Sequence, residues 1–186
     1  MEPSEPTVDA KHPVTVLAGP YGHPFHPMLV TIPIGAWVAS VVFDVVSRLA
    51  DAPAAYARGA QWLIGIGIVG ALLAALFGFL DLFAIPSGTR AFTTALIHMA
   101  LNLAVVALFA VAFLLRRDRL DDATPIGLLV LSVVALALLG ASGWLGGRLT
   151  FRYGVRVVDE REQADGFHPS RPEEDPPWVS PRSSPG

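Results

Sequence analysis

The chain has 186 residues, of which 53% are hydrophobic and only 16% are charged, and it contains no cysteine. Because an ordinary soluble domain carries roughly a quarter of charged residues, this chain has too few to cover a surface that faces water. The lack of cysteine excludes disulfides, iron–sulfur clusters and cysteine nucleophiles within the chain. Residues 159–186 carry seven acidic and three basic residues, so the rest of the chain has a net charge of only +1. No strongly basic stripe exists, which disfavours binding of nucleic acid.

Four long apolar stretches follow one another along the chain, at about residues 28–49, 60–85, 91–115 and 123–147. Each reaches the roughly 20 residues that a helix needs to cross about 30 Å of hydrocarbon. The apolar runs are continuous, whereas the strands of a membrane barrel alternate. Short loops make consecutive helices antiparallel neighbours. We therefore expect an all-α fold: an integral membrane, up-down bundle of four transmembrane helices.

The two ends of the chain are polar. Residues 1–21 lack the apolar core of a signal peptide, so we expect no cleaved targeting segment there. Residues 159–186 hold six prolines among acidic residues and serines, and such a segment buries too little apolar area to offset its ordering entropy. We expect this acidic tail to be disordered and residues 22–158 to form the transmembrane domain. No repeat of 20–50 residues is evident.

Glycines suggest close helix packing. The run Gly65–Gly70 matches the dinucleotide-binding fingerprint G-x-G-x-x-G, but that motif requires a strand-to-helix turn, and here it lies inside an apolar stretch. We interpret it as packing, since small residues let helix backbones approach in a bilayer. The stripe of small residues that supports this interpretation is Gly67, Ala71, Ala74 and Gly78. Gly143 and Gly147 predict the same kind of contact for the fourth helix.

Polar residues recur on one face of the third stretch. Thr94, His98 and Asn102 are spaced by four residues, so a helix places them in one row. For His98 three roles stay open: a hydrogen bond between helices, ligation of haem or a metal ion, and proton handling. Asp81 continues the small-residue stripe of the second helix and is expected to face the bundle. It either holds a loop at the interface, paired with Arg90, or acts directly on protons or a cofactor.

The first helix is preceded by a histidine–proline segment, His23-Pro24-Phe25-His26-Pro27. Because proline disfavours a helical conformation of the residue before it, we expect an extended segment that folds as a lid over the bundle. Two histidines fall short of the three or four protein ligands that zinc usually takes.

Asp44 lies towards the other end of the first helix, on the face of Trp37 and Ser40. We expect an interfacial carboxylate that pairs with Arg48 or Arg58. Arginines also recur every four residues after the fourth helix, at positions 148, 152 and 156, where they either bind anionic headgroups or form an ordinary flank.

Helix directions alternate, so one end of the bundle collects most of these polar side chains. The candidate polar site comprises His23, His26, Asp81, Arg90, His98, Asn102 and Arg148, with Trp144 beside them. Such a cluster at one end of an apolar bundle suggests a site open to one side of the membrane. No Ser–His–Asp, His-Glu-x-x-His or Walker pattern accompanies it.

Three segments resemble a bacterial family of predicted four-helix membrane proteins with a domain of unknown function. They are residues 22–35, which contain the histidine–proline segment, residues 85–90 with His98 and Asn102 downstream, and residues 146–157. The resemblance covers residues 22–158. It implies a multi-pass protein of the bacterial cytoplasmic membrane, and because relatives occur joined to Rieske iron–sulfur domains, it hints at electron transfer with a separate redox partner.

Two classes of function remain. The first is a non-catalytic membrane protein whose candidate polar site binds lipid headgroups or a partner protein. The second is an electron-transfer module with haem b, in which His98 and either His26 or His23 are the axial ligands and Arg90 or Arg148 lies near the propionates. The two sides of the bundle carry six and five basic residues, so the positive-inside rule only slightly favours cytoplasmic termini.

Overall fold

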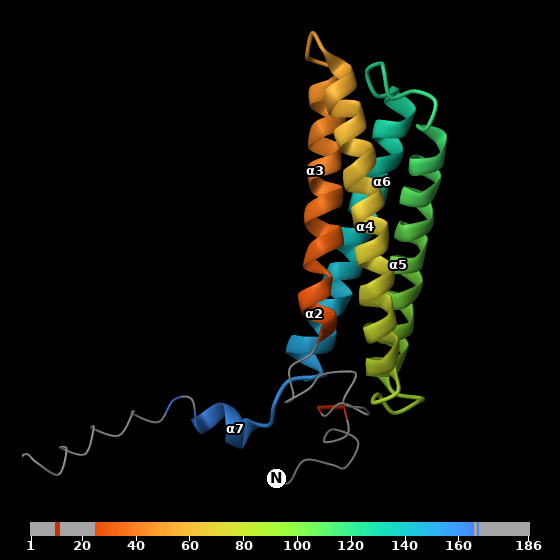
Figure 1. The fold of residues 1–186 in the computed structure, drawn as a ribbon. Coiled ribbons are helices and arrows are strands. Elements are labelled where there is room, and N and C mark those ends of the chain that lie inside the picture. Colours follow the sequence, from red (N-terminus) through yellow and green to blue (C-terminus); the bar gives the residue numbers. More distant parts are fainter. Residues whose placement is uncertain (1–9, 12–24, 166, 168–186) are drawn as a thin grey trace, which may run out of the picture.

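A computed structural model describes residues 10–11, 25–165 and 167 of the chain. Within them it contains helices and no strand: α2 (Phe25–Leu29), α3 (Thr31–Ser47), α4 (Pro53–Leu82), α5 (Arg90–Leu115), α6 (Ile126–Gly147), the π-helical turn η3 (Arg148–Arg152) and α7 (Glu160–Asp165). The four long helices run side by side as an up-down bundle (Figure 1). The fold is thus the all-α, four-span bundle that hydropathy predicts.

Local sequence sets the helix ends. Pro53 occupies the first turn of α4, where its missing N–H costs nothing. The side chain of Thr89 accepts a hydrogen bond from the Phe92 N–H and so caps the start of α5. Gly88 has a φ of 79° just before that cap, a conformation that favours glycine. Because Pro53 starts α4, this helix begins several residues earlier than the apolar run from about residue 60 suggests.

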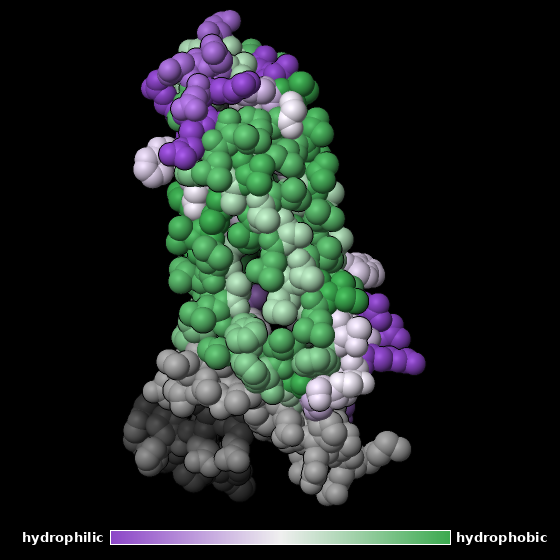
Figure 2. All heavy atoms as spheres, turned by 90° about the vertical axis from the view of Figure 1, so that its right-hand side faces the viewer, coloured by the Kyte–Doolittle hydropathy of each residue, from purple (hydrophilic) through white to green (hydrophobic). Residues whose placement is uncertain are grey.

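Four helical segments are long and apolar enough to cross a membrane: residues 25–47, 53–82, 90–115 and 126–152. Large apolar side chains point outward along all of them, and Figure 2 shows the resulting hydrophobic surface with polar residues above it. Phe151 and Trp144 are 92% and 75% exposed, near the end of their span, where aromatic rings prefer to lie.

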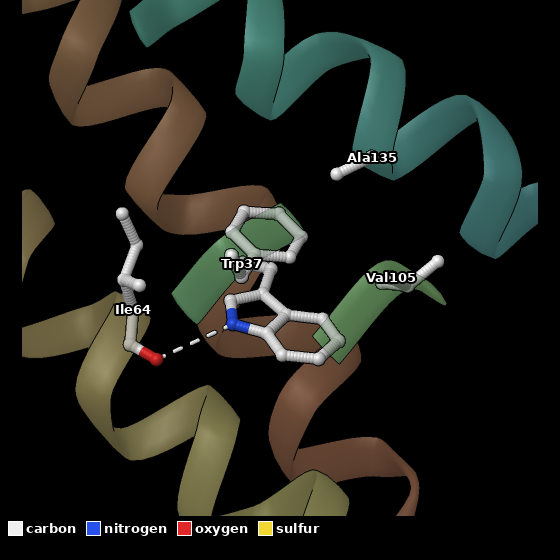
Figure 3. Close-up of a cluster of buried hydrophobic side chains, with 5 residues drawn as sticks. Trp37, Ile64, Val105 and Ala135 are labelled. Carbon is white, nitrogen blue, oxygen red and sulfur yellow. Dashed lines mark hydrogen bonds between the residues drawn. The ribbon is translucent and has the colours of Figure 1, made fainter. Parts of the chain in front are cut away.

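The helices α3 and α5 face each other diagonally, because each packs mainly on α4 and α6. Across this diagonal the rings of Trp37 and Phe109 stack, with centroids 4.3 Å apart and planes at 9°. Ile64 from α4 and Ala135 from α6 complete a fully buried apolar layer with Val105 (Figure 3). This layer separates two groups of polar side chains, one towards each end of the bundle.

Glycine packing is confirmed for the second helix. The indole N–H of Trp37 donates to the carbonyl of Ile64 at 3.3 Å, and a Cβ on Gly67 would collide with that indole. A Cβ on Gly70 would lie 2.6 Å from Ile32. For the fourth helix the prediction is wrong: a Cβ on Gly143 would meet nothing, and one on Gly147 only Phe151 of the next turn.

The start of the expected acidic tail also differs from the prediction. Residues 160–165 form the short helix α7, and the amide of Gln163 donates to the carbonyl of Val158. The last residues of the tail lie outside the described residues, as does most of the polar N-terminal segment.

Candidate functional site

Two histidines meet near one end of the bundle. His26 projects from α2 and His98 from α5, and their ring centroids lie 6.3 Å apart with planes at 84°. The Nδ1 atom of His26 is 2.8 Å from the carbonyl oxygen of Ala74 on α4. The Nδ1 atom of His98 is likewise 2.8 Å from the carbonyl oxygen of Ser142 on α6. Because a carbonyl oxygen only accepts, each Nδ1 carries the proton and each Nε2 offers a lone pair.

Asn102 and Ser142 complete the surroundings of His98. The Asn102 amide lies 3.1 Å from His98 Nε2 and also donates to the His98 carbonyl, one helical turn earlier. The Ser142 hydroxyl lies 3.0 Å from Nδ1 and donates to that carbonyl at 3.2 Å. The row of Thr94, His98 and Asn102 thus faces the bundle, as the helical spacing predicts.

Asp81 faces the bundle too, but its partner is not Arg90. Its carboxylate forms an ion pair with the guanidinium of Arg156 at 3.1 Å, and it lies close enough to His26 for the two to interact electrostatically. Arg90 points outward and is exposed. The expectation failed because Arg156 returns to the bundle through a turn in which its own φ is 60°, a feature that sequence periodicity does not reveal.

The segment that closes this end is C-terminal. Val155 is buried against Ile85, Ala95 and Leu149, and the N–H of Arg156 donates to the carbonyl of Ala10. The expected lid of residues 23–27 is different: from Phe25 onward it is helix α2, which continues the first span. His23 and Pro24 lie outside the described residues.

Arg148 lies at this polar end, in the first position of η3. One of its terminal nitrogens donates to the hydroxyl of Tyr153 at 3.2 Å, while its buried Nε has no hydrogen-bond partner among the described residues. This bond from Arg148, followed by one with Thr94, lowers the pKa of the Tyr153 hydroxyl below its usual value. Arg152 is exposed, and so is Trp144, at 75%.

A second buried polar group lies at the opposite end and was missed by the sequence analysis. Asp44 does not pair with Arg48 or Arg58. Both oxygens of its carboxylate accept hydrogen bonds from Arg116, at 2.8 and 3.1 Å. The side chains of Asp44 and Arg116 are 0% and 3% exposed. The sequence signal for this pair is an arginine placed directly after the apolar run of residues 91–115.

The loop before α6 supports this ion pair. The hydroxyl of Thr124 donates to Asp44 at 2.8 Å, and its N–H donates to the hydroxyl of Ser47. Arg48 donates to the carbonyl of Thr124, and the exposed Arg58 pairs with Asp121. Every oxygen of the Asp44 carboxylate is therefore hydrogen-bonded, which is what burial of a charge requires.

A groove of about 630 Å³ opens on the outer, membrane-facing side of α4. Its lining is almost wholly apolar and includes Trp62, Ile66, Val69 and Phe113. None of the candidate polar residues lines it, so it is separate from the histidine pair.

Comparison with known proteins agrees with this architecture. Residues 22–159 match the family described as "Predicted membrane protein (DUF2231)". The chain belongs to this family. A search of curated proteins found no match to the chain, and neither did a search of solved structures. This DUF2231 member is therefore a membrane protein with four candidate spans.

Proposed function

We propose that this DUF2231 protein is a non-catalytic, multi-pass protein of the bacterial cytoplasmic membrane that binds an anionic phospholipid headgroup at the polar end. The observation that carries the proposal is the guanidinium of Arg148, whose buried Nε has no hydrogen-bond partner among the described residues. Guanidinium groups match the geometry of phosphate and bind it with paired hydrogen bonds.

The charges around Arg148 favour an anion. Arg152 and Arg90 are exposed at the same end, and Tyr153 joins Arg148 to Thr94, whose hydroxyl donates to the Arg90 carbonyl. The carboxylate of Asp81 does not cancel this charge, because Arg156 pairs with it. Basic residues near the membrane surface each contribute about 1 kcal/mol to binding of anionic lipid.

The alternative function, electron transfer through haem b, receives less support from the geometry. A porphyrin held by His26 and His98 would have to lie between the two rings, and its macrocycle would have to extend between the surrounding helices. Glycine contacts bring α4 and α6 directly against the two imidazoles. We therefore rank haem second; its prediction is a coloured protein whose Soret band sharpens on reduction, and it requires a separate redox partner.

The orientation remains part of the proposal. With four spans both termini share one side, and the small excess of basic residues there favours the cytoplasm. Reporter fusions at the C-terminus and in the loop between α5 and α6 would separate the two orientations.

Lipid titration of the purified full chain tests the headgroup proposal. We expect phosphatidylglycerol to raise the Tm in detergent more than phosphatidylcholine, because only the former is anionic. Arg148→Gln and the exposed Arg152→Gln should each reduce this difference, while Arg117→Gln at the opposite end should not. Equal shifts with both lipids would contradict a lipid site and favour a partner protein as the occupant.

A further inference from the structure

Residues of the two halves of the bundle face each other at matching depths. Three pairs of residues that face each other across the α2/α3–α5 diagonal are each separated by 72 positions: His26 and His98, Trp37 and Phe109, Asp44 and Arg116. Equal spacing at three depths means that α2–α3 and α5 run parallel and in register, as the first and third helices of an up-down bundle do. The two hairpins, α2–α4 and α5–α6, therefore present residues at matching depths to a common axis.

Burial follows the same correspondence along both helices of each hairpin. With the separation of 72, the buried positions of α3 and α5 that match are Pro33/Val105, Trp37/Phe109, Ser40/Ala112 and Asp44/Arg116. With a separation of 68, those of α4 and α6 that match are Ala60/Leu128, Ile64/Ser132, Gly67/Ala135 and Ala74/Ser142.

The correspondence includes the surroundings of the histidines. In each hairpin an imidazole bonds through Nδ1 to a backbone carbonyl of the following helix, at Ala74 and Ser142. Four residues beyond each carbonyl stands a glycine, and a Cβ there would lie 2.8 Å from His26 at Gly78 and 3.1 Å from His98 at Gly146. One histidine on a helix is ordinary, but here the residue, its carbonyl partner and its glycine all occur twice.

We propose that His26 and His98 form a single binding site for a Cu(I) ion on the axis between the two hairpins. Histidine ligands of metals usually donate their other ring N–H to a backbone carbonyl or carboxylate, which fixes the tautomer and the ring orientation. Both histidines already have this arrangement. The proton on Nδ1 leaves Nε2 of each ring as the ligand atom.

The ring separation suits one ion. A metal about 2.0 Å from an imidazole nitrogen lies about 3.2 Å from the ring centre, so two rings on opposite sides of one ion have centres about 6.4 Å apart. The observed separation of the His26 and His98 centroids is 6.3 Å. The Asn102 amide, which contacts His98 Nε2, retains its second bond to the His98 carbonyl when it yields that nitrogen.

A pair of imidazoles on one axis favours Cu(I) as the ion. Zinc usually takes three or four protein ligands, whereas the singly charged Cu(I) ion readily binds two ligands on a line, and imidazole suits copper. This site includes neither Arg148 nor the exposed Arg90 and Arg152. The headgroup proposal and the copper proposal are therefore tested separately.

Anaerobic titration of the full chain in detergent with Cu(I), against a chromophoric Cu(I) chelator, tests the site. We expect one ion per chain, and binding weakened at least 10-fold by His26→Gln or by His98→Gln. His168→Gln in the tail and Arg148→Gln at the polar end are the controls, and both should bind as the wild type does. Undiminished binding by either histidine variant would overturn the proposal.

X-ray absorption of the Cu(I)-loaded wild type gives a second test that does not depend on how well the variants fold. Two imidazole ligands and no sulfur are expected. A sulfur ligand, which Met28 or Met99 would supply next to the histidines, or fewer than two imidazoles, would overturn the assignment.

Discussion

Asp44 and Arg116 occupy corresponding positions in the two hairpins, yet they carry opposite charges and form a buried ion pair with each other. Two identical hairpins would place two carboxylates or two guanidinium groups at this point. Because one hairpin carries the aspartate and the other the arginine, the two side chains attract each other only when the first hairpin packs against the second. A bundle built from one chain can use such a pair to specify its own assembly.

Breaking this ion pair should be costly. We expect Asp44→Ala to lower the free energy of unfolding by about 3–5 kcal/mol, because it leaves the Arg116 guanidinium buried without a counter-charge. The matched control is Asp121→Ala, which removes the exposed pair with Arg58 and should cost less than about 1 kcal/mol. Denaturant unfolding in detergent measures both. Similar losses for the two variants would contradict the assigned burial.

Gly67 should tolerate no larger residue. A Cβ at this position collides with the indole of Trp37, and we expect Gly67→Ala to destabilise the bundle by about 1–3 kcal/mol, the usual cost of overpacking. Gly35 offers a control on the neighbouring helix, since a Cβ there meets no atom within 4 Å. Gly35→Ala should leave the Tm unchanged or raise it, because alanine has the higher helix propensity.

Cysteine scanning can test which face of α5 meets lipid, since the natural chain has no cysteine. Thr94→Cys and His98→Cys should react slowly with a lipid-soluble maleimide, because these positions face the bundle. Ile97→Cys should react fast, because Ile97 is 50% exposed on the outer face. Equal labelling of positions 97 and 98 would show that the helix is rotated from the orientation described here.

Tyr153 should titrate at a lower pH than an ordinary tyrosine. The Arg148 guanidinium donates to its hydroxyl and stabilises the phenolate, which lowers the pKa. The absorbance difference between wild type and Tyr153→Phe during alkaline titration isolates this group. Arg148→Gln should move its midpoint up, towards the usual value of about 10; an unchanged midpoint would contradict the hydrogen bond.

The sequence was sufficient for the four spans and for the inward face of α5. Hydropathy and helical periodicity are local properties, and lipid penalises every exposed polar group in the same way. Thus Thr94, His98 and Asp81 are recognised as inward-facing without knowledge of their neighbours.

The identity of partners was not predictable in the same way. Asp81 binds Arg156 only because the chain after η3 turns back, with Arg156 at a positive φ. Asp44 binds Arg116 because α3 and α5 are diagonal neighbours. Both pairings depend on how helices and turns are placed in three dimensions, and local charge spacing pointed to Arg90 and to Arg48 or Arg58 instead.

The central claim is that His26 and His98 act as one unit, and a double-mutant cycle tests it most directly. The Tm values of His26→Ala, His98→Ala and the double variant would be measured in detergent, without metal and with Cu(I), and again with zinc or haem. We predict that Cu(I) raises the wild-type Tm and makes the two losses strongly non-additive, since either replacement alone removes the shared ion. Additive losses that Cu(I) leaves unchanged would contradict the claim and reduce each histidine to a separate interhelical hydrogen bond.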